Sequence, residues 1–212
     1  MKFRRTFVLV LIPIFAVTAF MAVRHYREPH RPERLSLKLS DWQAFEGSWT
    51  ITDGVLNDGK GGRGDKLVTG DAALNEFVLS GDLRFDTDRD YEFGDAGFIF
   101  RASNIKVGTD SMYGYYAGIR PGTNTLKLGR MEDDYTDLAV KKLARPVQTG
   151  IWYHFVVQAE QCRLHIQVTD DTGPDAEIFL NDQACVLRAG RVGLRAYSMV
   201  ASWRNLMLQP SL

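Results

Sequence analysis

The sequence is dominated by short stretches in which apolar and polar residues alternate. In Phe77–Phe85 every second residue is apolar or glycine. Such alternation is typical of β-strands with one buried and one exposed face. The later stretches are Phe98–Arg101, Tyr115–Arg120, Thr125–Arg130, Trp152–Ala159, Arg163–Thr169, Ala176–Leu180, Val192–Ala196 and Ser202–Leu208. Turn residues separate them, and no stretch after residue 35 has a helical period, so this part is predicted to be an all-β sandwich or barrel.

The N-terminus has the composition of a targeting segment. Basic residues precede Phe7–Val23, an apolar run that just reaches the ~17 residues needed to span a bilayer. No clear cleavage motif follows, so residues 1–23 are either a signal peptide or a signal anchor that holds the protein at the membrane. Both alternatives predict one N-terminal hydrophobic helix and an extracytoplasmic location, secreted or membrane-anchored, in the periplasm or at the cell surface. Residues 24–37 are expected to be a polar linker, and residues 38–209 the folded domain.

The charge distribution excludes one class of partner. The formal net charge is zero, but several basic residues lie before residue 35, so the folded domain carries more acidic than basic groups. A nucleic-acid-binding domain usually has a basic patch or a high isoelectric point. We therefore do not expect nucleic acid as a partner.

Two cysteines, Cys162 and Cys185, lie on strand-like segments late in the chain. In an extracytoplasmic protein an even pair indicates a disulfide. Two buried thiols are the alternative.

Several motifs of catalysis and phosphate binding are incomplete. Gly59–Gly64 resembles a phosphate-binding loop, but Asp65 stands at the lysine position and no helix follows. His154 and His165 are isolated from any metal-binding or catalytic spacing, and no nucleophile elbow is present. These motifs therefore predict no catalytic residue.

The motifs taken in order carry more information than each alone. They are Trp42, Gly47–Trp49, Asp53–Leu56, Asn75–Leu79, Asp95–Ala102, Gly114–Arg120, Thr125–Arg130, Ile151–Phe155, Gly193–Tyr197 and Ala201–Leu206. This order resembles the concanavalin A-like, or laminin-G-like, jelly roll. Within that group it is most similar to levanase-type carbohydrate-binding modules and the 3-keto-disaccharide hydrolase family. The resemblance implies a two-sheet antiparallel β-sandwich with a sugar site on or beside its concave face.

The resemblance also implies site residues. In the levanase-type modules the arginine at the position of Arg101 contacts the ligand, and an aromatic residue at the position of Tyr197 lies near it. Arg120 stands where those modules carry an acidic residue. Strand alternation turns Arg101 away from the core residues Phe98 and Phe100. It adds Tyr116, Arg120 and Arg195 to the same outer face, so these residues and Tyr197 are predicted to form an exposed patch.

The predicted site combines groups suited to sugars. Aromatic rings stack on the apolar face of a sugar, and arginine offers five donors in a fixed fork. The turn at Asp134 and Tyr135 is a candidate rim for this site. Several arginines together also suit an acidic sugar or a carboxylate. The alternative is that these arginines are solvated and pair with the acidic residues.

The segment Asp86–Asp95 is strongly acidic, with carboxylates at Asp86, Asp88 and Asp90. Ca²⁺ takes six to eight oxygen ligands, so these three are candidate ligands. Laminin-G-like sandwiches often carry structural calcium, which the resemblance therefore implies as a candidate here. A solvated loop is the alternative, and no other cofactor is expected.

The predicted function is non-catalytic carbohydrate binding, with an oligo- or polysaccharide as partner. A glycoside or 3-keto-disaccharide hydrolase is the first alternative. It would need two carboxylates in one pocket, for which Asp95, Glu132 and Asp134 are the candidates. An adhesion or protein-interaction domain is the second alternative, and it would need an exposed apolar patch.

Overall fold

The computed structural model describes residues 31–69, 74–87 and 92–210. These residues form two antiparallel β-sheets packed face to face, with one short 3₁₀-helix, η1 (Leu39–Asp41), and no α-helix. The predicted all-β sandwich is therefore confirmed. The expected hydrophobic helix at Phe7–Val23 lies outside the described residues. Within the described ranges, no helix has the length and apolar character needed to cross a bilayer.

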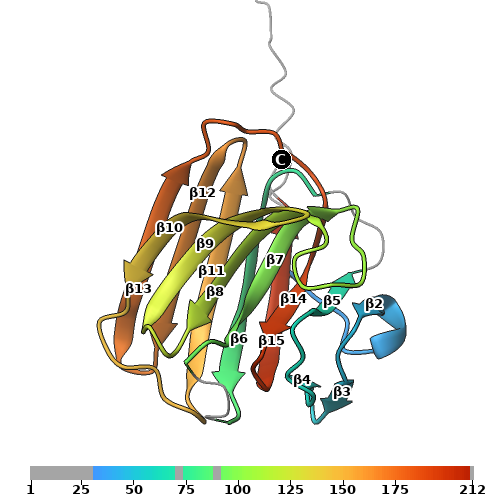
Figure 1. Ribbon diagram of the computed structural model, residues 1–212, viewed down its shortest axis with the longest axis vertical. Coiled ribbons are helices and arrows are strands. Elements are labelled where there is room, and N and C mark those ends of the chain that lie inside the picture. Colours follow the sequence, from blue (N-terminus) through green and yellow to red (C-terminus); the bar gives the residue numbers. More distant parts are fainter. Residues whose placement is uncertain (1–30, 70–73, 88–91, 211–212) are drawn as a thin grey trace, which may run out of the picture.

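Each sheet is built from strands that are far apart in sequence (Figure 1). The eight-stranded sheet has the order β13 (Gly173–Asn181), β12 (Arg163–Asp170), β11 (Trp152–Glu160), β6 (Phe77–Phe85), β15 (Ala201–Pro210), β4 (Val55–Asp58) and β3 (Trp49–Thr52), and β1 (Glu33–Arg34) also pairs with β15. The seven-stranded sheet has the order β10 (Tyr135–Lys142), β9 (Thr125–Glu132), β8 (Tyr113–Arg120), β7 (Asp95–Ser103), β14 (Arg191–Tyr197), β5 (Asp65–Thr69) and β2 (Trp42–Phe45).

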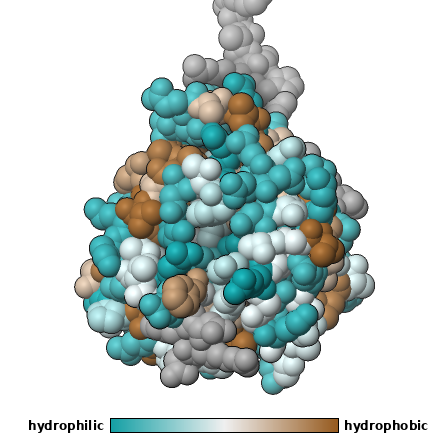
Figure 2. All heavy atoms as spheres, viewed as in Figure 1, coloured by the Kyte–Doolittle hydropathy of each residue, from teal (hydrophilic) through white to brown (hydrophobic). Residues whose placement is uncertain are grey.

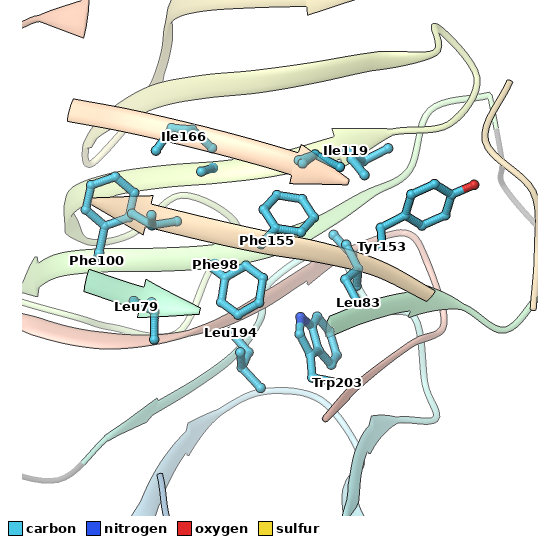
Figure 3. Packing of buried hydrophobic residues seen from close by; sticks show 14 of the residues in the cluster. Leu79, Leu83, Phe98, Phe100, Ile119, Tyr153, Phe155, Ile166, Leu194 and Trp203 are labelled. Atoms are coloured by element: carbon cyan, nitrogen blue, oxygen red, sulfur yellow. The ribbon is translucent and has the colours of Figure 1, made fainter. Parts of the chain in front are cut away.

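The main core lies between the two sheets and is rich in aromatic rings. Phe98 of β7 packs against Phe155 of β11, with ring centroids 5.1 Å apart. Figure 3 shows these rings pointing toward each other from opposite sheets, with Leu194 and Trp203 beside them. The alternation read from the sequence thus corresponds to inward-facing residues on both sheets, because successive side chains of a strand point to opposite faces.

A disulfide links Cys162, in the turn between β11 and β12, to Cys185, in the segment before β14. The two Cα atoms are 5.2 Å apart. The bridge ties the segment 182–190 to the end of the eight-stranded sheet. A closed loop of this kind stabilises the fold mainly by restricting the unfolded chain.

A buried carboxyl pair holds the glycine-rich segment between β4 and β5. Asp58 is 0% exposed and accepts hydrogen bonds from the backbone nitrogens of Ser48 (3.1 Å) and Lys60 (3.3 Å). Burial and the neighbouring carboxyl group of Asp65 raise the pKa of Asp58 to about 6. The folded protein therefore retains a proton here that the unfolded chain releases near pH 4.

This pair predicts a pH-dependent stability. Since the pKa of Asp58 is higher in the folded state, its contribution to stability is complete below about pH 4 and is lost as the pH rises through 6. Asp58→Asn keeps the shape and adds a donor toward Asp65. We expect it to raise the free energy of unfolding at pH 7.5 by about 1–2 kcal/mol. Urea unfolding from pH 4 to 8 measures this.

The matched control for Asp58→Asn is Asp53→Asn, at an exposed turn. It should leave the pH profile of unfolding unchanged. Equal profiles for wild type and Asp58→Asn would contradict the role given to the pair.

Candidate functional site

On the outer face of the seven-stranded sheet, polar and aromatic side chains surround a hollow of about 170 Å³. We call it the Arg195 hollow. Its lining residues are Asp95, Thr109, Asp110, Arg120, Lys127, Tyr135, Arg195 and Tyr197.

Strand alternation brings these side chains together. On β14, Leu194 and Ala196 face the main core, so Arg195 and Tyr197 point outward. Antiparallel pairing places Tyr197 directly opposite Asp95, the first residue of β7. The hollow therefore forms where three central strands, β14, β7 and β8, meet.

Side chains from β8, β9 and β10 complete the strand-borne part of the hollow. Arg120 ends β8, and Lys127 lies on β9 between the core residues Leu126 and Leu128. Tyr135 begins β10, at the edge of the sheet.

Arg195 is the electrostatic centre of the hollow. Its side chain is 4% exposed, and its two terminal nitrogens each donate a 2.8 Å hydrogen bond, to Asp95 Oδ1 and to Asp110 Oδ1. Arg120 Nη2 donates to the other oxygen of Asp95 at 3.0 Å. Burial opposes the charge of Arg195, but the carboxylates and nearby tyrosines outweigh it and raise the pKa. Arg195 therefore stays charged, and two hydrogen bonds orient its guanidinium.

Tyr116 lies beneath the hollow. It is fully buried, and its hydroxyl donates to Asp95 Oδ1 at 2.8 Å. The Arg195 guanidinium lies over the Tyr116 ring, 4.8 Å from its centroid. Burial and the Asp95 carboxylate raise the pKa of Tyr116 well above its usual value, so the hydroxyl remains a donor. A Cβ at Gly118 would stand 2.0 Å from this hydroxyl, so only glycine leaves room for the ring.

Tyr135 forms a second aromatic wall beside a lysine. Lys127 Nζ lies 4.5 Å from the centroid of the Tyr135 ring and 3.1 Å from Asp137 Oδ1. The Tyr135 hydroxyl donates to the same Asp137 oxygen at 2.8 Å. Lys127 is thereby held against the ring, which keeps its charge at the wall of the hollow.

A loop between β7 and β8 supplies Thr109 and Asp110. Two side chains dock this loop on the sheet. Glu46 Oε2 accepts a hydrogen bond from the backbone nitrogen of Gly108 at 2.8 Å. Lys66, which is fully buried, donates from Nζ to the carbonyl oxygens of Gly108 and Gly64. The position of Asp110 thus depends on Glu46, which directly follows β2, and on Lys66 of β5.

Most of the predicted site residues lie at the hollow. Arg120, Arg195, Tyr197 and Tyr135 line it, and Tyr116 lies under it. The expected exposure of Tyr116 and Arg195 is wrong, because they are 0% and 4% exposed and pair with Asp95. Asp134 does not line the hollow: this residue is exposed in the turn between β9 and β10, where its Oδ1 accepts a hydrogen bond from the backbone nitrogen of Tyr135.

The expectation that Arg101 is exposed on the same face is wrong. Arg101 is 1% exposed and donates to the backbone carbonyl oxygens of Asn75 (2.6 and 3.0 Å), Gln161 (2.6 Å) and Leu187 (3.3 Å). Its backbone has a φ of 49°, and the pairing of β7 with β8 shifts register after Phe100. This irregularity interrupts the alternation from which the orientation of Arg101 was predicted.

Sequence reasoning missed three lining residues and gave a fourth another role. Thr109 and Asp110 lie on a loop, where no periodicity predicts orientation. Lys127 had a usable signal, because it alternates with Leu126 and Leu128. For Asp95, the sequence indicated only a catalytic role or a place in the acidic loop.

The calcium prediction finds no support among the described residues. Asp86 is bound to Arg84, Asn57 and Ser202, with distances of 2.5 to 2.9 Å. Asp88 and Asp90 lie outside the described residues. No group of three or more His, Cys, Asp or Glu side chains in the described ranges is arranged to hold a metal ion.

Comparison with solved structures defines the class of fold. The chain is similar to the carbohydrate-binding module CBM66 from Bacillus subtilis, with 18% identity over 80% of this chain and 95% of that one, and a TM-score of 0.63. Lectin II from Ulex europaeus is 11% identical over 87% of this chain and 99% of that one, with a TM-score of 0.64. The exoplasmic/lumenal domain of VIP36, solved with Ca²⁺ and Man3GlcNAc, is 10% identical over 85% of this chain and 88% of that one, with a TM-score of 0.64. The chain thus has a lectin-type jelly-roll fold.

The family assignment is more specific than the fold. Residues 36–209 match the family described as 3-keto-alpha-glucoside-1,2-lyase-like domain, and the chain belongs to that family. The resemblance found in the sequence is therefore confirmed. A search of curated proteins finds no match.

Proposed function

We propose that this protein binds a neutral carbohydrate in the Arg195 hollow and does not cleave it. The observation that carries the proposal is the meeting of an oriented arginine pair with two tyrosine walls in one hollow. Tyr135 and Tyr197 provide rings for the apolar face of a sugar. Arg120 is 30% exposed; among the described residues its Nη2 binds Asp95 and its Nε is buried without a partner, so Nη1 is left to bind sugar hydroxyls.

The charge balance favours a neutral ligand over an acidic one. Arg195 is paired with Asp95 and Asp110, Arg120 with Asp95, and Lys127 with Asp137. The cations are thus already compensated by carboxylates. An acidic sugar would have to compete with them, whereas hydroxyl groups can bind both the carboxylates and the arginines.

The size of the hollow favours a single ring. Pockets for drug-sized ligands are roughly 300–1,000 Å³, and this hollow is well below that range. We expect modest affinity, because polar groups at an exposed site must first give up water.

An enzyme is the second candidate, and the family match favours it. Asp95 and Asp110 place two carboxylates in one hollow. However, Asp95 accepts hydrogen bonds from Arg120, Arg195 and Tyr116, so it has little capacity left to take a proton. Asp110 also holds Arg195. The histidines of the domain, His154 and His165, do not line this hollow. This arrangement supports binding more than acid–base chemistry.

The proposed location is extracytoplasmic, with residues 1–23 as signal peptide or anchor, 24–37 as linker and 38–209 as the binding domain. The disulfide between Cys162 and Cys185 supports it, because such bridges persist in oxidising compartments. The adhesion alternative has less support. Figure 2 shows hydrophobic residues scattered among hydrophilic ones on the face in view, without one large apolar patch.

The test is titration calorimetry with methyl α-D-glucopyranoside, methyl α-D-mannopyranoside and methyl β-D-fructofuranoside. We expect one sugar to bind, and Arg120→Ala to weaken it roughly tenfold, because a charge-assisted hydrogen bond contributes about 1.5–3 kcal/mol. The matched control is Arg163→Ala, whose side chain is 71% exposed on the other sheet. No binding, or equal loss in both variants, would contradict the proposal. New products from sucrose or its 3-keto derivative would favour the enzyme.

A further inference from the structure

We infer that the ligand site continues beyond Tyr197 into a second subsite, so that the ligand has at least two sugar units. This inference rests on the proposed function. Tyr197 lines the Arg195 hollow and also a second, larger hollow of about 450 Å³. The second hollow is lined by Gly61, Arg63, Phe93, Tyr197 and Ser198. One tyrosine therefore forms a wall common to two adjacent spaces.

The second hollow repeats the chemistry of the first. Phe93 is an exposed aromatic residue, with 65% of its surface accessible. Arg63 is also exposed, and its side chain has no hydrogen bond or ion pair among the described residues. Beside Tyr197, an aromatic ring provides a stacking surface, and a guanidinium without a partner in the described ranges provides a hydroxyl-bridging group for a second ring. A ligand that covers Phe93 would explain why this large apolar side chain is exposed beside the hollow.

Both sides of the second hollow rest on one buried residue. Met199 is 1% exposed. A Cβ at Gly61 would stand 3.2 Å from the carbonyl carbon of Met199, and a Cβ at Gly94 would stand 2.2 Å from its Cγ. Gly61 also has a φ of 63°, which favours glycine, and a Cβ at Gly94 would stand 2.7 Å from the Ser198 carbonyl oxygen, so both positions suit glycine. Arg63 comes two residues after Gly61, and Phe93 comes directly before Gly94. Both residues of the second hollow thus lie next to a glycine that packs on Met199.

Backbone hydrogen bonds fix the Arg63 side further. Ser198 donates from its nitrogen to the carbonyl oxygen of Gly62 at 2.7 Å, and the nitrogen of Gly62 donates to Asp65 Oδ2 at 2.5 Å. Ser198 follows Tyr197 directly in sequence. The glycine-rich segment is thus tied to the end of β14, so the shape of the second hollow is largely present before ligand binds, and binding need not order it.

The test compares one-ring and two-ring probes on the full chain. The pairs are methyl α-D-glucopyranoside with kojibiose, methyl α-D-mannopyranoside with α-1,2-mannobiose, and methyl β-D-fructofuranoside with levanbiose. For the pair that binds, we expect the disaccharide to bind roughly tenfold more tightly than the methyl glycoside. In Phe93→Ala, and in Arg63→Ala, this ratio should fall below about threefold, while the affinity for the methyl glycoside stays within about twofold of wild type.

Phe179→Ala is the matched control, because Phe179 is equally exposed, at 71%, but lies on β13 of the other sheet. It should leave the ratio unchanged. Equal affinities for one ring and two, or an unchanged ratio in Phe93→Ala and Arg63→Ala, would overturn the second subsite and leave the proposed function intact. Failure of all six sugars to bind would overturn the proposed function, and the second subsite with it. Thermal unfolding of each variant establishes that it is folded.

Discussion

Replacing Arg195 with leucine is expected to abolish sugar binding and to lower the free energy of unfolding by about 3–5 kcal/mol. The side chain is 4% exposed and holds both Asp95 and Asp110 at 2.8 Å. Its removal leaves a buried carboxylate without its main partner, which costs more than the ion pair contributed. It also frees Asp110, so the loop-borne wall of the hollow is no longer oriented.

Arg195→Lys separates the two effects of this change. A lysine keeps the charge but cannot donate in two fixed directions, so it restores part of the stability and little of the affinity. Urea unfolding measures the first and calorimetry the second. Arg163→Leu, an exposed arginine on the opposite sheet, should be close to wild type in both. Full affinity in Arg195→Lys would show that two-directional donation is not needed.

Replacing Arg101 with methionine is expected to lower stability as Arg195→Leu does, but to leave sugar affinity unchanged. The guanidinium satisfies the carbonyl oxygens of Asn75, Gln161 and Leu187. Each of these three part-buried carbonyl oxygens costs about 1–2 kcal/mol when left without a donor, so the free energy of unfolding should fall by about 3–6 kcal/mol. Arg101 is absent from the lining of the Arg195 hollow.

Measuring affinity on the folded fraction at low temperature distinguishes this expectation from the role that the family resemblance implies. If Arg101 contacts the ligand, Arg101→Met will lose affinity while still folded, as Arg120→Ala does. If Arg101 is structural, the folded variant will bind within about twofold of wild type. Arg163→Met is the control for stability.

Much of the fold was predictable because it depends on local periodicity. The alternation in Phe77–Phe85 and in Thr125–Arg130 predicted strands with one buried face, and both are strands in the structure. The same argument placed Arg195 and Tyr197 on an outer face together with Arg120, and these three side chains line one hollow. A two-residue period is a property of a single strand, so it can be read without knowing the partner strands.

The site was predictable only in part because two of its determinants are not periodic. Arg101 sits at an irregularity in β7, where one residue with a φ of 49° changes the direction of the side chain. Asp110 reaches the hollow because Lys66 and Glu46, distant in sequence, dock its loop. Neither the irregularity in β7 nor the docking of this loop can be read from the local pattern of apolar and polar residues.

The sequence by itself determined which residues alternate, and therefore which faces of the strands are apolar. It also determined that tyrosines and arginines occupy one outer face. Only the tertiary structure decided that β14 lies between β7 and β5, which puts Arg195 beside Asp95 and Lys66. The physical reason is that strand pairing is set by contacts between residues far apart in the chain. Burial of the core and closure of long loops select those contacts, and no local pattern records them.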